Sequence, residues 1–163
     1  MNEELDVAGE VARLLDREAI ADLIYAYCHH FDLNEPEAVG ALFTEDATVD
    51  YGPEAATIRG GASIAPTIAV GLATTFAATS HHVSNVRIAL DGPDRARSVS
   101  YLYAWHRYVD GSPDGELWGR YLHRFERTAA GWRIAELVLQ AVGMEHFHRA
   151  TMHPIGRRRL RSG

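Results

Sequence analysis

Apolar residues recur every three or four positions between residues 16 and 32, a spacing typical of one buried face of a helix. The residues of this stripe are Ile20, Leu23, Ile24, Tyr27 and Phe31. Asp16 precedes the stripe and is suited to cap the helix N-terminus, where the helix dipole also favours Glu18. The pattern therefore predicts a helix from Asp16 to Asp32 that carries Tyr27 and Asp32 at its inner end.

Asp32 allows two interpretations. A carboxylate carried into an apolar interior is costly unless a partner or a function holds it there. The alternative is that Asp32 caps the turn into residues 33–37, which is a common role for aspartate. From this stretch alone, the turn is the more common role.

The rest of the first half predicts short elements. Residues 36–43 have the composition of a second helix with a proline at its start. Residues 48–51 are strand-like and end at a Gly-Pro pair, and residues 57–59 are a candidate partner strand. Residues 62–72 are apolar with helical spacing and predict a third helix.

The second half of the chain predicts four long strands, rich in aromatic and β-branched residues and separated by the turn signals DGPD, DGSPDGE and TAAG. These strands are Thr79–Leu90, Arg95–Val109, Leu117–Thr128 and Trp132–Val142. Four strands joined by tight turns form an antiparallel meander. The sequence therefore predicts an α+β fold, a cone-like barrel in which a curved antiparallel sheet wraps around three N-terminal helices.

Alternation along the strands predicts an internal pocket rather than a solid core. His81 and Asn85 share one face of the first long strand, and His106 lies in a row of small and apolar residues on the second. On the third long strand, Tyr121 and its neighbour Arg120 point to opposite faces. A concave face lined in this way is suited to holding a small molecule.

Composition and charge narrow the class of protein. The chain has 163 residues, 47% hydrophobic and 23% charged, which is typical of one globular domain. We expect that domain to cover residues 1–150 and a basic tail to cover residues 151–163. A net charge of −6 argues against a nucleic-acid-binding surface, because phosphate binding requires a basic face. The sequence has no signal-peptide pattern and no apolar run long enough to span a membrane, so we expect a cytoplasmic protein without a membrane partner.

Nine histidines raise the question of a metal site. Neighbouring residues on a strand point to opposite faces, so His81 and His82 are not suited to bind one ion. The sequence contains no HExxH pattern and no glycine-rich nucleotide motif, and the single cysteine, Cys28, has no metal-ligand spacing around it. We therefore expect no metal and no cofactor.

The remaining chemistry is one carboxylate, a few histidines and several tyrosines around an apolar pocket. A histidine beside a carboxylate is held in one tautomer, and its protonated form is stabilised. Tyrosine hydroxyls are neutral donors that can polarise a carbonyl group or assist a leaving hydroxide. This set suits general acid–base catalysis, although each histidine taken singly is better explained by a structural role.

Four motifs, in order along the chain, carry a resemblance to a known family. They are DREAIADLIYAY, LFTEDATVDY, SHHVSNVRI and GWRI, within a match from about Arg13 to His148. In this order they resemble the SnoaL-like domains of the nuclear-transport-factor-2-like superfamily. The resemblance implies a cone-shaped α+β barrel with a deep pocket.

Within that superfamily, scytalone dehydratase, the bile-acid 7α-dehydratases and the lindane dehydrochlorinase are lyases that need no cofactor and use an aspartate–histidine pair. The resemblance implies that Asp32 and His81 form this pair. It also matches Tyr27 to a tyrosine of the bile-acid enzymes. Tyr51 and His106 match residues of scytalone dehydratase, where the histidine is catalytic.

The resemblance does not carry a substrate over to this chain. Gly119 stands near the position where scytalone dehydratase has a serine, and Ala141 near that of an arginine of the bile-acid enzymes. The same fold also hosts ketosteroid isomerases, polyketide cyclases, epoxide hydrolases and non-catalytic binding modules.

We therefore expect a cofactor-free lyase of dehydratase type, or an isomerase, for an apolar, hydroxylated small molecule that is polyketide-, terpenoid- or steroid-like. The expected catalytic residues are Asp32, His81, Tyr27 and His106, and the expected substrate-binding residues are Tyr51, Asn85 and Tyr121. The alternatives are a non-catalytic ligand-binding or assembly module, a polyketide cyclase and an epoxide hydrolase. A sheet with one uncovered aromatic face also predicts a homodimer or homotrimer.

Overall fold

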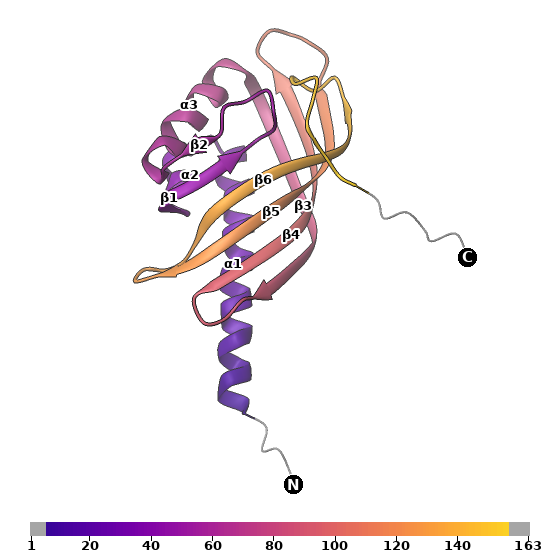
Figure 1. Ribbon diagram of the computed structural model, residues 1–163. Helices are drawn as coiled ribbons and strands as arrows, with labels where there is room; N and C mark the ends of the chain where they lie inside the picture. Colours follow the sequence, from indigo (N-terminus) through magenta and orange to yellow (C-terminus); the bar gives the residue numbers. More distant parts are fainter. Residues whose placement is uncertain (1–5, 157–163) are drawn as a thin grey trace, which may run out of the picture.

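Three helices and three shorter strands precede or follow a meander of four long strands in the computed structural model, which describes residues 6–156 (Figure 1). The elements are α1 (Val7–Asp32), α2 (Pro36–Gly40), β1 (Phe43–Asp50), β2 (Ile58–Arg59), the 3-10 turn η1 (Gly61–Ser63), α3 (Ile64–Thr74), β3 (Phe76–Leu90), β4 (Arg95–Tyr108), β5 (Gly115–Thr128), β6 (Gly131–Glu145) and β7 (His153–Pro154). The arginines of the expected basic tail lie outside the described residues.

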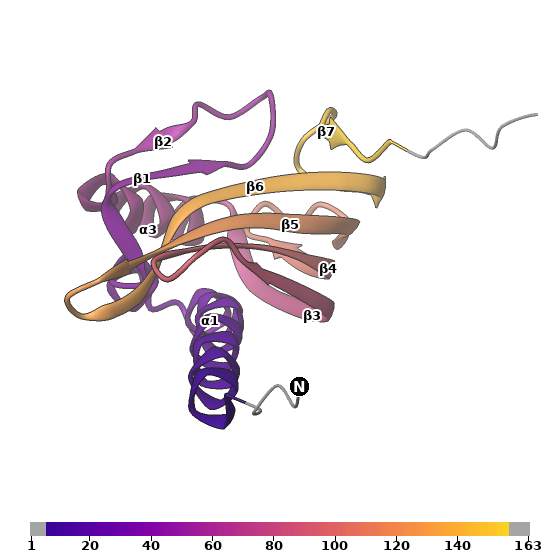
Figure 2. The same ribbon diagram turned by 60° about the horizontal axis from the view of Figure 1, so that its bottom comes forward.

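The sheet has the order β2-β1-β6-β5-β4-β3, and β7 pairs with β6. Strands β3 to β6 form the antiparallel meander that the turn signals predicted. Strand β1 runs parallel to β6, and so does β7, so the complete sheet is mixed and does not close on itself. Figure 2 shows the curvature of this sheet. The α+β cone predicted from the sequence is confirmed.

Helix α1 begins earlier than its pattern predicted. It starts after Asp6, whose Oδ1 accepts a hydrogen bond from the Gly9 backbone N–H at 3.0 Å, so the prediction that Asp16 caps the helix is wrong. Asp16 lies inside the helix, and its carboxylate instead accepts hydrogen bonds from Arg127 at 2.7 Å and from Trp132 Nε1 at 3.0 Å. Aspartate is tolerated mid-helix here because the β5–β6 hairpin supplies partners for its side chain.

The apolar stripe of α1 is confirmed as its buried face. Ile20, Ile24 and Tyr27 are almost completely buried, and the helix contacts β3 and β6. The Tyr27 ring packs edge-on against Phe43 and Tyr121, with ring centroids 6.1 and 5.6 Å apart. This packing fixes the inner end of α1, and with it Asp32, against the sheet.

The short elements differ from prediction by a few residues. Helix α2 ends at Gly40, and β1 begins at Phe43 instead of Thr48, because pairing with β6 extends the strand. Helix α3 begins at Ile64, two residues after the predicted start. Within residues 6–156, no helix is long and apolar enough to cross a membrane.

Alternation predicts the faces of β4 correctly but fails in β3. Every second residue of β4 from Ala96 to Tyr108 is buried. In β3 the pairing with β4 shifts between Ser84 and Arg87, and Asn85 has a φ of 50° and is exposed. A bulge of this kind resets the phase of a strand. The prediction that Asn85 shares the inner face with His81 is therefore wrong.

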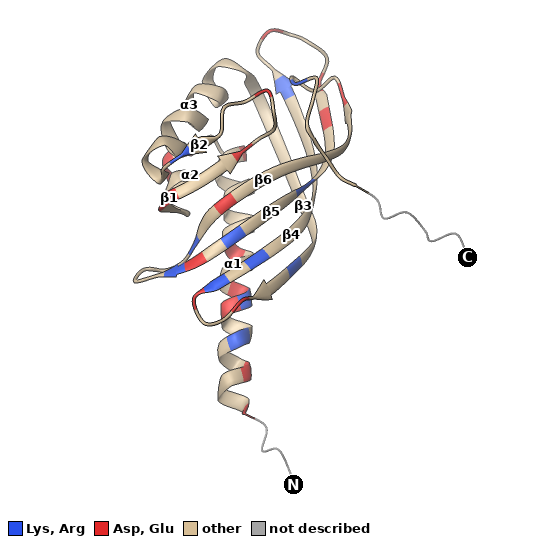
Figure 3. Cartoon of the chain, in the orientation of Figure 1, with Lys and Arg blue, Asp and Glu red and all other residues tan. Residues whose placement is uncertain are grey.

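The outer face of the meander has no covering element within the described residues, and it carries both aromatic and charged side chains. Tyr101 and Trp118 are 44% and 41% exposed there. Figure 3 shows that basic residues gather on β3, β4 and β5, and one of them, Arg124, pairs with Glu136 of β6 at 2.8 Å.

Candidate active site

A cavity of about 280 Å³ lies between the inner end of α1, helix α3, the sheet and the segment after β6. Most of its wall is apolar, including Phe31, Ile68, Phe76, Leu139 and Phe147. The polar side chains on the wall are Tyr27, Tyr51, Thr67, His81, His106, Tyr121, His148 and Arg149. A small apolar cavity with a few convergent polar groups is the usual form of a small-molecule site.

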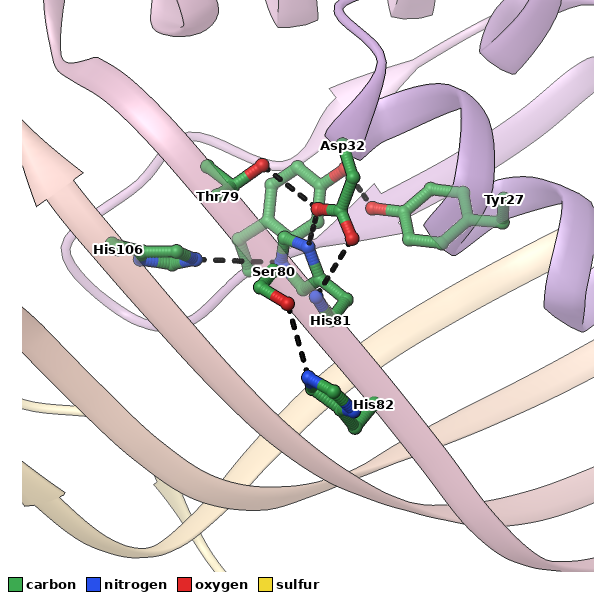
Figure 4. A network of polar contacts seen from close by, with 8 residues as sticks. Tyr27, Asp32, Thr79, Ser80, His81, His82 and His106 are labelled. Atoms are coloured by element: carbon green, nitrogen blue, oxygen red, sulfur yellow. Dashed lines mark hydrogen bonds and ion pairs between the residues drawn. The ribbon is translucent and has the colours of Figure 1, made fainter.

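Asp32 and His81 meet where the end of α1 reaches β3 (Figure 4). His81 Nδ1 lies 2.6 Å from Asp32 Oδ1. The backbone N–H of His81 donates to Asp32 Oδ2 at 2.8 Å, and Thr79 Oγ1 donates to Oδ1 at 2.8 Å. The Asp32 side chain is therefore bound to β3 through three contacts and does not cap the turn after the helix.

These contacts keep Asp32 ionised. Burial raises the pKa of this carboxyl group, but the hydrogen bonds and charge of His81, together with the bond from Thr79, outweigh burial and hold the pKa below its ordinary value. An ionised carboxylate accepts a hydrogen bond from Nδ1–H, so neutral His81 carries its free lone pair on Nε2. The side chain of His81 is 6% exposed and belongs to the cavity wall.

His106 faces the same atom of His81. The two Nε2 atoms are 3.3 Å apart, which is long for a hydrogen bond. Burial, followed by the charges of His81 and His148, lowers the pKa of His106 to about 3, so its ring is neutral at ordinary pH. Since Nε2 of His81 is bare, this contact is a hydrogen bond only in the tautomer in which Nε2 of His106 carries the proton. In that tautomer Nδ1 of His106, which has no hydrogen-bond partner within the described residues, is the bare nitrogen, and His106 is a neutral donor directed at the basic nitrogen of His81.

Two tyrosines form a second polar group on the wall. Tyr27 and Tyr51 share a hydrogen bond of 2.6 Å between their hydroxyl oxygens. Burial raises the pKa of Tyr51 to about 12 and that of Tyr27 well above its ordinary value, so both hydroxyls remain protonated. Tyr121 is buried beside Tyr27, and burial likewise raises its pKa.

The structure brings six of the seven predicted site residues together. Five of them line the cavity, namely Tyr27, Tyr51, His81, His106 and Tyr121, and Asp32 reaches it through His81. Asn85 is separate from them, on the exposed bulge.

Sequence reasoning missed the segment Phe147–Arg149, which follows β6 and lines the cavity. The run HFHRATMH at residues 146–153 combines aromatic and basic residues, and this mixture was the available signal. Among the residues that the structure describes, no three His, Cys, Asp or Glu side chains lie close enough together to hold a metal ion.

A cone of this topology, with a largely apolar cavity that carries a few polar groups, defines the class of small nuclear-transport-factor-2-like domains. Residues 12–138 match the model of the SnoaL-like domain family, and the chain belongs to that family. Among curated proteins, none matches the chain.

Solved structures agree with this assignment. The "Putative Scytalone Dehydratase" of Novosphingobium aromaticivorans is 32% identical, with 92% of this chain and 99% of that chain covered and a TM-score of 0.85. A "putative aromatic ring hydroxylase" of the same organism is 27% identical, with 81% and 93% covered and a TM-score of 0.75. Hexachlorocyclohexane dehydrochlorinase (LinA) type 2 is 18% identical, with 88% of this chain and 99% of that chain covered. Its TM-score of 0.78 shows a shared fold.

Proposed function

We propose that this protein is a cofactor-free lyase that eliminates water from a hydroxylated, largely apolar small molecule of polyketide-, terpenoid- or steroid-like type. The observation that carries the proposal is the 2.6 Å contact between Asp32 Oδ1 and His81 Nδ1 on the wall of an apolar cavity. The names of two structural neighbours, a dehydratase and a dehydrochlorinase, support an elimination reaction.

In the proposed reaction, His81 Nε2 takes a proton from a carbon next to a carbonyl group. The electrons of that C–H bond form the new C=C bond, and the C–O bond to the hydroxyl group breaks. The protonated His81 then gives its proton to the departing hydroxide, which leaves as water, and neutral His81 is regenerated. Asp32 stabilises the imidazolium while it exists, and a base paired in this way contributes a factor of about 10² to 10⁴ in rate.

The neutral donors have complementary roles in this proposal. His106 directs an N–H at His81 Nε2 across 3.3 Å, so the substrate must enter between the two rings before His81 can act as a base. Catalytic contacts are often long before the substrate binds. Once separated, His106 can donate to the substrate, as can the hydroxyl pair of Tyr27 and Tyr51.

An isomerase would use the same base but would return the proton to another carbon without loss of water. Product analysis by mass spectrometry separates the two reactions, because elimination lowers the mass of the product by one water and isomerisation does not.

The proposal is tested with a panel of cyclic β-hydroxyketones, whose elimination products absorb in the ultraviolet as conjugated enones. Wild-type protein should accelerate enone formation from at least one member, and His81→Ala should abolish this acceleration. His82→Ala is the matched control, because His82 is the adjacent exposed residue, bound to Ser80 Oγ at 3.0 Å on the opposite side of β3 (Figure 4). Equal rates in the two variants would contradict the proposal.

A further inference from the structure

The segment after β6 folds back over the cavity and places an arginine on its wall. His146 has a φ of 48° at the turn, and Phe147, His148 and Arg149 then line the cavity before β7 rejoins the sheet. We call residues 146–154 the strap. The proposed elimination does not use Arg149.

Arg149 is half-buried, and the charge of the Glu54 carboxylate acts on its guanidinium from beyond ion-pair distance. One of its guanidinium N–H groups donates to the Tyr51 backbone oxygen at 2.7 Å, and the guanidinium lies 5.8 Å from the Tyr51 ring centroid. It forms no ion pair with any carboxylate of residues 6–156. Burial lowers the pKa of Arg149 below its ordinary value, but a guanidinium remains charged in proteins.

The remainder of the wall does not neutralise this charge. No Asp or Glu side chain is among the lining residues of the cavity, and Asp32 lies behind His81, engaged with it and with Thr79. Charges in a partly desolvated cavity act more strongly than they do in water. The cavity therefore has one fixed positive charge facing an otherwise neutral, apolar space.

The strap does not depend on Arg149 for its position. The Glu54 carboxylate accepts hydrogen bonds from the backbone N–H groups of Ala150 and Thr151 at 3.1 and 2.7 Å, and His153 Nε2 lies 2.9 Å from Asp50 Oδ2. The Tyr108 hydroxyl also accepts a hydrogen bond from the His148 backbone N–H at 3.0 Å. Three residues outside the strap, Glu54, Asp50 and Tyr108, thus hold it without Arg149, which leaves most guanidinium donors of Arg149 without a structural task.

We infer that the cavity selects a ligand whose apolar body carries an anionic oxygen, such as a carboxylate, and that Arg149 is the residue that selects it. This inference rests on the proposed function, since it adds an acid group to the substrate of the same site. A planar guanidinium pairs with a carboxylate through parallel hydrogen bonds, which fixes orientation as well as affinity. A carboxylate held at Arg149 would anchor the apolar body so that its reacting carbon lies near His81 on the same cavity wall.

The test compares two probes of the same shape, 2-naphthoate and its neutral amide, 2-naphthamide, by isothermal titration calorimetry at low salt. Wild-type protein should bind the carboxylate at least about tenfold more tightly than the amide, the ratio expected for one charged hydrogen-bonding contact. Arg149→Met should bring the two affinities together, and Arg149→Lys should keep part of the preference.

Glu54→Gln is the control for the strap, because it weakens the contacts to residues 150 and 151 and keeps the Arg149 guanidinium. It also removes the negative charge of Glu54 that acts on Arg149, which favours binding of an anion further. It should retain the preference for the carboxylate. The inference is overturned if wild-type protein binds the amide as tightly as the carboxylate or fails to bind the carboxylate at millimolar concentration. It is also overturned if Glu54→Gln loses the preference as fully as Arg149→Met.

His81→Ala separates this inference from the proposed function. The variant should lose turnover and keep the preference for 2-naphthoate, because Arg149 is unchanged. Wild-type turnover without a preference for the carboxylate would overturn only the role of Arg149. A preference for the carboxylate without turnover of any substrate would overturn only the proposed elimination.

Discussion

Replacing Asp32 with asparagine removes one charge from the proposed catalytic pair and nearly preserves its shape. An amide has one acceptor and one donor group, whereas the carboxylate accepts from His81 Nδ1, from the His81 backbone N–H and from Thr79 Oγ1. In one orientation the amide nitrogen meets the backbone N–H of His81, and in the other it meets Nδ1 and favours the wrong tautomer. Neither orientation satisfies all three partners.

The magnitude follows from the charge that Asp32 supplies when His81 is protonated. A carboxylate and an imidazolium about 4 Å apart between charge centres attract each other by roughly 4 kcal/mol at an effective dielectric constant near 20. Loss of the full attraction would lower the rate by about a thousandfold, since each 1.4 kcal/mol is a factor of about ten. Because asparagine retains one acceptor, we expect a fall in kcat of about a hundredfold to a thousandfold.

The assay is turnover of any substrate found in the hydroxyketone panel, measured for Asp32→Asn, His81→Ala, the double variant and His82→Ala. Circular dichroism at the assay temperature should show each variant folded. The double variant should be little worse than the worse single variant, because residues that act as one unit are not additive. His82→Ala should retain wild-type turnover.

Two results would refute this reasoning. If Asp32→Asn lowers the melting temperature but leaves kcat within a factor of about two, the carboxylate is a structural tie between α1 and β3 and not part of the reaction. If His81→Ala keeps near-full activity, the base lies elsewhere, and His106 is the next candidate.

Three further predictions concern stability, assembly and metal content. Burial lowers the pKa of His123 to about 3, so below about pH 6.5 this side chain binds a proton in the unfolded chain but not in the folded chain. The melting temperature should therefore fall between about pH 7 and pH 5, and it should fall less in His123→Phe. Equal falls in the two proteins would contradict the argument. The exposed Tyr101 and Trp118 on the outer sheet face favour a homodimer or homotrimer, which light scattering would exclude by finding only an 18.0 kDa particle at micromolar concentration. Elemental analysis of untagged protein should find less than one equivalent of zinc, iron or copper, and a full equivalent that survives dialysis would require a different mechanism.

Periodic features were predictable from the sequence because one short-range rule governs each of them. The stripe of α1 follows the helical repeat, and the four strands of the meander follow alternation and turn chemistry. The parallel pairing of β1 with β6 was not predictable, because the partners are about ninety residues apart in sequence, and no local pattern encodes such a contact. The start of α1 was missed since Asp6 and Asp16 are equally good caps by composition, and only the contacts of Asp16 with Arg127 and Trp132 distinguish them.

The candidate site was only partly predictable. Asp32 and His81 are 49 positions apart, and their predicted meeting rested on the family resemblance rather than on spacing. Asn85 was misplaced because a bulge depends on how two strands pair and not on the strand's own pattern. Arg149 was missed because its position on the cavity wall depends on the strap folding back along β6.

The bulge at Asn85 also divides β3 into two halves that contact different parts of α1, the first half through Asp32 and the second half through Arg17. Before it, His81 and Val83 occupy the inward positions, and after it Val86, Ile88 and Leu90 do, although the phase has changed by one residue. The second half is tied to α1, where Arg17 donates to the Ile88 backbone oxygen at 2.7 Å. In a strand without a bulge, a slip of one residue would turn every inward side chain outward. Here the bulge separates the registers of the two halves, so we expect a one-residue slip of the half beside Arg17 to leave the orientation of His81 towards the cavity unchanged.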